Sequence, residues 1–498
     1  MLGKFKTLLG HTLIYGLGNY GIKVIGFLLI PLYTRFLTPE DYGVMALVSM
    51  YTQALFVLMN LGQSVTLFRF YYERDNEEHR ERVVAAALWI VLLFAIPIAS
   101  VPLGFSSQIS TWLTGTPIWW ALIAIGTGTV LAKILLRMPF SIMRAGDQSK
   151  RYASWSLLRN GLATLFAVLF VAAFHLGATG VILSQFVGEV VMCILLTGTT
   201  LRMLHAGFRW ADIKEQLIFG LPLVPAGIAA FALDLTDRWF LRTWHTVEDV
   251  GIYSLGYRFG EIVTFVVTAF QLSWPQFLFS HRKEPGAPQL YAHMTNYYLA
   301  VLLLLWLGLA VFASELITIM APVSYAAASA VVPVVAAAMC LDGVTFMVNI
   351  GPPFFKRTIL RTYTICTAAV VNLGLNFLLI PKYGAMGAAW ATFGGFLTQA
   401  IITFIVSLRL YWVPYQWARL GTVTLAAAVI YALSLAVSSD TLALRIALKA
   451  ILVLAYPAAL VFGGFFEASD LDTACTIVER RSPVAGRVLR RVLPGVSA

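Results

Sequence analysis

Apolar runs of about 20 residues, separated by short polar gaps, recur along almost the whole of this 498-residue chain. A helix needs about 20 apolar residues to cross the hydrocarbon core of a bilayer. The pattern therefore predicts an all-α polytopic membrane protein. It predicts about fourteen membrane-spanning helices, at 11–33, 42–64, 83–103, 117–137, 152–174, 179–201, 216–236, 251–272, 293–313, 329–351, 363–380, 387–408, 420–436 and 443–464.

Two short motifs occur twice, at nearly the same offset. Pro39–Leu47 (PEDYGVMAL) matches Val247–Leu255 (VEDVGIYSL), and Leu176–Val181 (LGATGV) matches Tyr383–Ala388 (YGAMGA). Each copy lies at a short gap between two apolar runs. Duplicated helical units are typical of secondary transporters. Six spans per copy is an even number, so both copies would point the same way, as a parallel repeat about an axis along the membrane normal.

The duplication predicts how the chain is divided. Residues 1–206 would form an N-terminal six-helix lobe and residues 207–415 a C-terminal six-helix lobe. Two further membrane helices would lie in 416–464, outside the duplication. Residues 465–498 mix acids with several arginines and would form a basic cytoplasmic tail, lying on anionic lipid.

Composition excludes a soluble protein. The chain is 59% hydrophobic and 12% charged, with a mean hydropathy of +0.80, whereas soluble domains carry about 25% charged residues. The net charge of +11 comes from cations in the gaps between spans, so nucleic acid is not an expected partner. One set of alternate gaps holds 25 Lys and Arg residues and the opposite set holds 4. The positive-inside rule then places both termini in the cytoplasm.

Several enzyme classes lack their sequence signatures. The four cysteines have neither metal-ligand spacing nor the look of a disulfide framework, and no metal site is expected. Residues 1–33 do not resemble a cleaved signal peptide. No Walker A motif occurs, and the longest outer gaps have about 14 residues, which leaves little room for a catalytic loop. We expect a transporter without a cofactor rather than an enzyme.

Charged residues inside the spans are the candidate functional groups, because a charge near mid-bilayer is costly. Lys23 lies near the middle of the first span, with Asn19 on the same helix face. Arg159 in span 5 is expected to bind an anionic substrate or to pair with Glu189 in span 6. Lys133 lies four residues from the end of its span, and its long stem can reach the interface.

The second copy holds its own candidates. Arg258 would bind the same anionic group, with Glu261 three residues later on one helix face. Glu261 and Asp342 are the carboxylates best placed to couple transport to an ion, whereas Asp234 and Asp237 near a span end are explained by wetting.

Pro222 and Pro225 within span 7 predict a kink that serves as a gate or is simply static.

Three segments resemble one known family. Ile30–Gly43 (IPLYTRFLTPEDYG) resembles the start of the bacterial polysaccharide transporters, the O-antigen and exopolysaccharide repeat-unit flippases. Asn372–Trp390 looks like that family's corner between spans 11 and 12, and Gly251–Arg258 is similar to its span 8. The family belongs to a superfamily that includes multidrug antiporters and lipid II flippases. The resemblance implies two six-helix lobes around a central cleft.

The resemblance also implies a function. The substrate would be an oligosaccharide joined through a diphosphate to undecaprenyl or another polyprenyl carrier, flipped across the cytoplasmic (inner) membrane by alternating access. The route would serve O-antigen, exopolysaccharide or capsule synthesis, with a polymerase and export machinery as partners beside the membrane lipids. Energy would come from consumption of the product outside or from an H⁺ or Na⁺ gradient.

Other functions stay open at this point. A multidrug antiporter of the same fold would need acids and aromatic residues in its cavity, and a lipid II flippase differs only in substrate. A membrane glycosyltransferase or polysaccharide polymerase would need a catalytic acid on a large outer loop.

Overall fold

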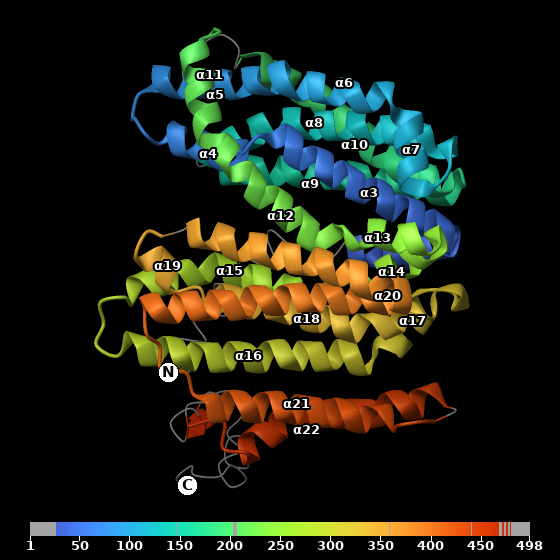
Figure 1. Ribbon diagram of the computed structural model, residues 1–498, viewed down its shortest axis with the longest axis vertical. Helices are drawn as coiled ribbons and strands as arrows, with labels where there is room; N and C mark the ends of the chain where they lie inside the picture. Colours follow the sequence, from blue (N-terminus) through green and yellow to red (C-terminus); the bar gives the residue numbers. More distant parts are fainter. Residues whose placement is uncertain are drawn as a thin grey trace. The chain divides into compact units, whose positions relative to one another are not determined.

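The computed structural model describes residues 26–146, 148–202, 207–357, 359–439 and 441–467, and five positions between 471 and 479 (Figure 1). Within these ranges every regular element is a helix. Eleven helices are long and apolar enough to cross a membrane, or twelve if Val247–Gly260 and Val263–Ser280, which meet at 45°, form one bent span. The predicted all-α, multi-pass membrane architecture is confirmed.

The number of spans depends on one long helix. α20 (Ile359–Leu410) contains two of the predicted spans, 363–380 and 387–408, joined at Gly384, whose backbone is not helical (φ 53°, ψ −129°). Most of the first predicted span, 11–33, lies outside the described residues. The count of fourteen and the parallel orientation of the two copies stay predictions.

The described residues divide into two compact units. The N unit is formed by those of Ile22–Leu255 and Ile365–Thr392, and the C unit by those of Gly256–Thr364 and Phe393–Ala498. This division follows contacts in space, whereas the predicted lobes follow the duplication, so the lobes stay a prediction.

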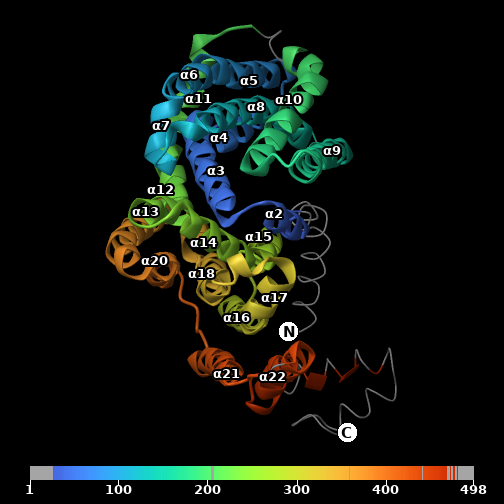
Figure 2. The same ribbon diagram turned by 90° about the vertical axis from the view of Figure 1, so that its right-hand side faces the viewer.

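The N unit begins with short helices and ends with part of α20. Its helices are α2 (Ile30–Phe36), α3 (Pro39–Asn60), α4 (Gln63–Tyr71), α5 (Glu77–Ile90), α6 (Ile96–Gly104), α7 (Ser106–Thr114), α8 (Trp120–Ala145), α9 (Ser149–Ala167), α10 (Gly177–Arg202), α11 (Trp210–Gly220), α12 (Val224–Leu235), α13 (Asp237–Trp244) and most of α14 (Val247–Gly260). One apolar core joins α3, α4, α5, α6 and α8. A second joins α8, α9 and α10, which lie side by side in Figure 2.

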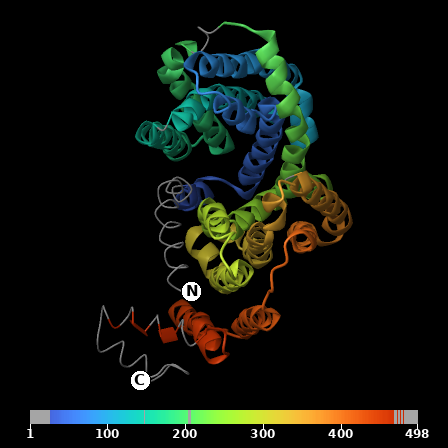
Figure 3. The same ribbon diagram turned by 90° about the vertical axis from the view of Figure 1, so that its left-hand side faces the viewer.

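The C unit contains the remaining helices. They are α15 (Val263–Ser280), α16 (Ala287–Val311), α17 (Ala313–Met320), α18 (Ala328–Val348), α19 (Gly351–Phe354), the two ends of α20, α21 (Trp417–Leu435) and α22 (Leu442–Phe462). The last two match predicted spans 13 and 14. They pair with each other, as Figure 3 shows, and share an apolar core with α16.

An ion cluster attaches α22 to α17. The Glu315 side chain is 2% exposed and forms ion pairs with Lys449 Nζ at 2.7 Å and Arg445 Nε at 2.9 Å. Lys449 also donates to the carbonyl oxygen of Val311 at 2.9 Å. A buried carboxylate without such partners would be very unfavourable. Arg445 and Lys449, which fall within the predicted span 443–464, therefore have a structural role.

The chain just after α22 is also attached to the C unit. The Glu467 carboxylate lies 2.7 Å from His293 Nε2 and 3.2 Å from Arg419. The hydrogen bond with His293, and then the charges of His293 and Arg419, lower the pKa of Glu467. A lowered carboxyl pKa adds stability above the pKa of the unfolded chain, and that stability is lost as the pH falls through the folded value.

The duplicated motifs have the same local structure. Thr38 caps α3 and Thr246 caps α14: each hydroxyl accepts from the N–H of an aspartate three residues later (Asp41 and Asp249) at 3.1 Å. Each aspartate in turn accepts from the N–H of its threonine at 3.1 Å. This reciprocal pair is a capping box, which fixes where a helix starts.

The same motifs pack against each other inside the N unit. A Cβ added to Gly43 would lie 1.9 Å from the carbonyl oxygen of Val247, and one added to Gly251 would lie 1.9 Å from that of Pro39. Val247 and Pro39 occupy equivalent positions in the two copies. The contact is therefore reciprocal, as across a two-fold axis, and it brings α3 and α14 into backbone contact that only glycine permits.

The second duplicated motif also uses glycine. Gly177 (φ 56°) and Gly384 (φ 53°) both have a positive φ, which glycine adopts without strain. Gly180 lies against the carbonyl of Phe170 and Gly387 against that of Leu379, with distances of 3.0 and 2.4 Å from an added Cβ. Both copies thus turn the chain tightly between two helices.

A 3₁₀ turn occurs beside Pro222 and Pro225, and the kink or gate expected of them stays a prediction. α11 ends at Gly220, a 3₁₀ turn covers Leu221–Leu223, and α12 begins at Val224. Gly220 packs on a second break, between α3 and α4, where Leu61 (φ 46°) and Gly62 (φ 73°) are both left-handed. An added Cβ on Gly62 would lie 2.2 Å from the oxygen of Gly220. Two helix breaks therefore meet at one point.

We predict that Gly43→Ala lowers the melting temperature of the purified protein strongly, because the new methyl group would overlap a backbone oxygen that cannot rotate away. Overpacking typically costs about 1–3 kcal/mol, and more where backbone must move. Gly161→Ala in α9 is the matched control, since nothing lies within 4 Å of its added Cβ. Equal melting temperatures for the two variants would contradict the proposed backbone contact.

Candidate functional site

A cavity of about 340 Å³ lies within the N unit, among α3, α4, α8 and α9. Its volume falls in the range of small-ligand sites, about 300–1,000 Å³. Four of its side chains are cationic, and no carboxylate is among the described residues that line it. The lining residues are Thr52, Gln53, Phe56, Phe68, Val130, Lys133, Arg137, Phe140, Ser141, Arg144, Tyr152, Ser156 and Arg159.

Three of the four cations come from one face of α8. Lys133, Arg137 and Arg144 are four and seven residues apart, the spacing of one stripe along a helix. At 1.5 Å per residue the stripe extends about 16 Å along the axis. Arg144 is exposed, whereas Lys133 and Arg137 are half-buried. The cavity therefore presents a row of positive charge from the end of the helix toward its middle.

Aromatic rings support the three guanidinium groups. Arg137 lies 5.5 Å from the ring centre of Phe56, Arg144 lies 4.8 Å from that of Phe68, and Arg159 lies 5.6 Å from that of Phe140. The face of a ring attracts a cation without neutralising it. A guanidinium held in this way keeps its positive charge at the cavity wall.

Arg159 is held by an ion pair. Its Nε donates to Glu189 Oε2 at 2.9 Å and its Nη2 to Oε1 at 2.6 Å. The Arg159 side chain is 30% exposed and that of Glu189 is 9% exposed. The pair that sequence analysis considered therefore exists, and Arg159 also reaches the cavity. Glu189 balances one of the four cations, so the wall of the cavity stays strongly positive.

Polar groups without charge complete the wall. Thr52, Gln53, Ser141, Tyr152 and Ser156 supply hydroxyl and amide groups beside the cations. Such groups donate and accept hydrogen bonds. The cavity can therefore bind a compact anion together with a neutral polar group attached to it.

The site predictions from sequence meet this geometry in different ways. Arg159 lines the cavity. Lys23 and Asn19 lie outside the described residues. Arg258 is exposed in the last turn of α14, and Glu261 is exposed where that helix bends into α15. Their roles in binding and coupling stay predictions.

Sequence analysis missed most of the α8 stripe. Lys133 was explained by its reach toward the interface, yet it lies on the cavity wall. The predicted span 117–137 ends at Arg137 and excludes Arg144, whereas α8 continues to Ala145. The spacing of residues 133, 137 and 144 indicates a row of cations on one helix face. This row is visible only when the helix is extended beyond the predicted span, to the end of α8.

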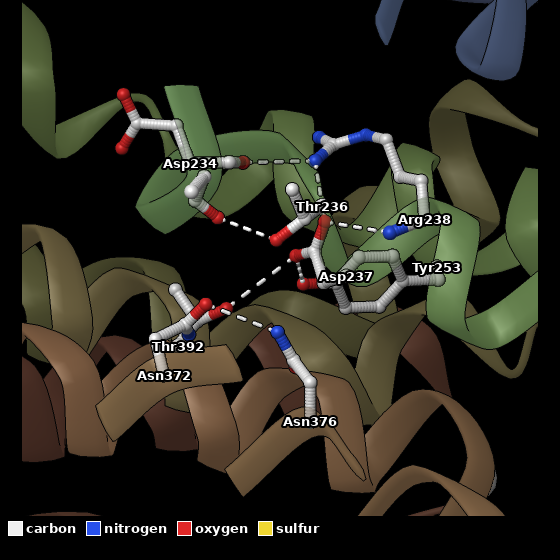
Figure 4. A network of polar contacts seen from close by, with 9 residues as sticks. Asp234, Thr236, Asp237, Arg238, Tyr253, Asn372, Asn376 and Thr392 are labelled. Carbon is white, nitrogen blue, oxygen red and sulfur yellow. Dashed lines mark hydrogen bonds and ion pairs between the residues drawn. The ribbon is translucent and has the colours of Figure 1, made fainter. Parts of the chain in front are cut away.

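A second group of charges is buried in the N unit (Figure 4). Asp237 is 2% exposed and lies 2.9 Å from Arg238 Nη1, which also donates to the carbonyl oxygen of Asp234 at 3.0 Å. The Tyr253 hydroxyl donates to Asp237. Contact with water is therefore the wrong explanation for the charge of Asp237, because protein groups replace water around its carboxylate. Asp234 is exposed, as expected.

The same network extends into α20. Thr392 Oγ1 donates to Asp237 at 3.4 Å, Asn372 donates to the carbonyl oxygen of Ala391 at 3.0 Å, and Asn376 donates to Asn372 at 3.0 Å (Figure 4). Asn372 and Asn376 belong to the segment that carried the family resemblance. The Asn372 side chain joins the two arms of α20 on either side of Gly384, and Asn376 donates to Asn372 from the same arm.

Comparison with known proteins identifies the family. A family model for polysaccharide biosynthesis proteins matches residues 8–281, more than half of the chain. The chain belongs to the polysaccharide biosynthesis protein family. This family member is also similar to the succinoglycan biosynthesis transport protein ExoT of Rhizobium meliloti (strain 1021), with 22% identity over 259 residues. That match covers 52% of the chain and 50% of ExoT, so the chain matches about half the length of this relative.

Solved structures confirm the fold of this family member. The lipid II flippase MurJ in its inward closed conformation gives a TM-score of 0.71 at 13% identity, over 91% of the chain and all of MurJ. A multidrug resistance MATE transporter in its inward-facing conformation gives 0.65 at 15% identity, over 78% of the chain and 94% of the transporter. These relatives are transport proteins, in agreement with the expectation of a transporter rather than an enzyme.

We predict that Asp237→Ala destabilises the protein by about 3–5 kcal/mol, the usual cost of leaving a buried charge without its partner, since Arg238 is 7% exposed. Thermal unfolding of the detergent-solubilised protein measures the effect. Asp75→Ala is the control, because Asp75 pairs with Arg80 at 2.7 Å but its side chain is 95% exposed. Similar losses in both variants would mean that burial of the Asp237 pair does not matter.

Proposed function

We propose that this protein is a flippase that moves polyprenyl-diphosphate-linked oligosaccharides across the cytoplasmic membrane for surface polysaccharide synthesis. One observation supports it above the others: the cavity of the N unit has four cations and no carboxylate on its described wall. A diphosphate is a compact anion that loses hydration when it leaves water. Arginine and lysine replace that hydration with charge-assisted hydrogen bonds.

The rest of the wall fits the rest of the head group. Gln53, Tyr152 and Ser156 offer hydrogen bonds to a sugar, and Phe56 and Phe140 offer apolar faces. In this proposal the lipid tail stays in the bilayer while the head group enters the cavity. Lys23, Asn19 and Arg258 stay additional candidate contacts to the head group.

Transport would proceed by alternating access and needs no covalent chemistry. The meeting point of the two helix breaks, at Leu61–Gly62 and at Gly220 with Pro222 and Pro225, is our candidate hinge. A break already lacks continuous helix hydrogen bonds, so bending there costs less than bending an intact helix. The 3₁₀ turn at Leu221–Leu223 provides such a break.

The charge of the cavity wall distinguishes this function from that of a multidrug antiporter. A cavity for cationic drugs needs carboxylates, whereas the described wall of this one is cationic. Lipid II shares the diphosphate and sugar chemistry, so charge alone does not distinguish it from other lipid-linked saccharides. The similarity to a succinoglycan transport protein favours an exopolysaccharide repeat unit over an O-antigen unit. A polymerase and export machinery are the partners that such a product requires.

The proposed orientation agrees with this use of the cavity. The excess of cations in alternate gaps places both termini and residues 65–82 on the cytoplasmic side of the inner membrane. The exposed Arg144 end of α8 then faces the cytoplasm, where lipid-linked sugars would be assembled. A positively charged entrance attracts an anionic head group before it binds.

For the orientation, we predict that a single cysteine at Asn76, in a variant lacking the four natural cysteines, reacts with a membrane-impermeant maleimide only after the cells are opened. Asn76 caps α5 in the polar segment between α4 and α5. Labelling of intact cells with a permeabilised outer membrane would place this segment on the periplasmic side and contradict the orientation.

For the cavity, we predict that Arg137→Gln and Arg144→Gln each weaken binding of a short-chain polyprenyl diphosphate to the purified protein by about 10-fold or more. A hydrogen bond to a charged group is worth about 1.5–3 kcal/mol, which corresponds to roughly 10- to 100-fold. Binding should also depend less on salt, because fewer charges attract the ligand.

Lys214→Gln provides the control for a general effect of charge. Lys214 is exposed on α11 and does not line the cavity. Its loss should leave binding unchanged. Wild-type affinity in the Arg137→Gln, Arg144→Gln double variant would exclude the cavity as the diphosphate site.

A further inference from the structure

A second, much smaller cavity lies within the C unit. Its volume is about 20 Å³, and a cavity needs about 10–15 Å³ to hold one water molecule. It therefore fits one water or one small ion. Its wall comes from α15, α18, α20 and the chain next to them: Gln271, Asp342, Thr345, Phe346, Asn349, Arg361, Gln399 and Thr403.

Two of these side chains have oxygens without a protein partner. Gln399 and Thr403 are each 5% exposed, and neither Gln399 Oε1 nor Thr403 Oγ1 has a hydrogen-bond partner in the described structure. They are four residues apart on α20, so both lie on one helix face. Leaving a buried polar group unsatisfied costs about 1–3 kcal/mol. Two such groups at one cavity indicate that something polar occupies it.

The opposite wall adds a carboxylate and a hydroxyl. Asp342 and Thr345 are three residues apart on one face of α18, and Asn349 follows directly after the end of this helix. The Thr345 hydroxyl donates to the carbonyl oxygen of Leu341 at 2.8 Å, so its lone pairs stay free to accept. Both walls of the cavity thus carry acceptor oxygens, which suit a hard cation better than a soft one.

Charge limits which cation fits. Asp342 is the sole carboxylate among the described lining residues, and the Arg361 guanidinium is close enough to interact with it electrostatically. Tyr298, whose buried hydroxyl lacks a partner, is the other ionisable group that interacts with Asp342. One carboxylate balances a single positive charge, so it cannot neutralise a divalent ion. A monovalent ion can take the place of Arg361 as the partner of Asp342.

We propose that Asp342, Gln399 and Thr403 bind one monovalent cation the size of Na⁺, with Thr345 and Asn349 as further oxygen ligands. Arg361 competes with the ion for Asp342, so the carboxylate has a partner in either state. Given the proposed function, an ion gradient would act on the transporter through this site. Binding of the ion itself does not depend on that function.

The test measures binding of ²²Na⁺ to the purified full-length protein in choline chloride at pH 8, without any lipid-linked substrate. We expect saturable binding of one ion per chain. Asp342→Asn should weaken it by about 10-fold or more, and Thr403→Val by several-fold. Arg361→Gln should strengthen it, because the competing cation is gone; a variant that was merely damaged would not bind more tightly.

Thr424→Val is the matched control, since Thr424 is exposed on α21 and its hydroxyl donates only to its own helix at 2.9 Å. It should bind as the wild type does. No saturable ²²Na⁺ binding by the wild type would overturn the proposal, and so would equal affinity in Asp342→Asn. Uptake of a proton by Asp342 without displacement by Na⁺ would also overturn it. Binding of polyprenyl diphosphate, measured on the same preparation, tests the proposed function separately.

Discussion

A charged side chain among apolar helices needs a charged partner, an aromatic face or a polar cavity. This constraint divides the charged residues of the chain into structural ion pairs and residues that line a cavity. Glu315 forms ion pairs with two cations of α22 and so attaches the C-terminal helix pair. Asp237 pairs with Arg238 and accepts a hydrogen bond from Tyr253, and Arg159 pairs with Glu189. The α8 stripe differs from these pairs, because Lys133, Arg137 and Arg144 gather at a cavity with no carboxylate on its described wall. The charges of these pairs are neutralised locally, whereas the stripe gathers several cations at one cavity, which is the basis of the proposed binding site.

Sequence periodicity predicts the helices well because a run of about 20 apolar residues has few other stable forms. It does not predict which helix face meets which neighbour. The position of Lys133 within its predicted span can be taken from the sequence. The cavity beside it cannot, because it forms only where α3, α4 and α9 pack around α8. The break at Leu61–Gly62 was also missed: Leu61 takes a left-handed backbone, which non-glycine residues rarely adopt. The two prolines were an easier signal, since proline removes a helix hydrogen bond in any context.

The repeated motifs can be recognised in the sequence because both copies form the same backbone structures. Both copies cap a helix with Thr and Asp, and both use a glycine with positive φ at a tight corner. The side chains around these shared elements have diverged. Gly177 lies against Asp41, whereas Gly384 lies against His245, which bonds to the carbonyl of Ile380. Backbone geometry tolerates few residue types, so it preserves the repeat, while the positions that hold charge are free to specialise.

The two cavities show opposite chemistry within one chain. The N unit offers donors, mostly guanidinium groups, and the C unit offers acceptor oxygens around one carboxylate. Opposite charge requirements are easier to meet at separate sites, because a cation bound among the α8 residues would be repelled, and an anion beside Asp342 would be repelled as well. Arginine suits the first cavity because it stays charged even when half-buried. A single carboxylate suits the cation site proposed for the second, since its charge would be balanced either by Arg361 or by a bound ion. Exchange between these two states would require little more than movement of one side chain.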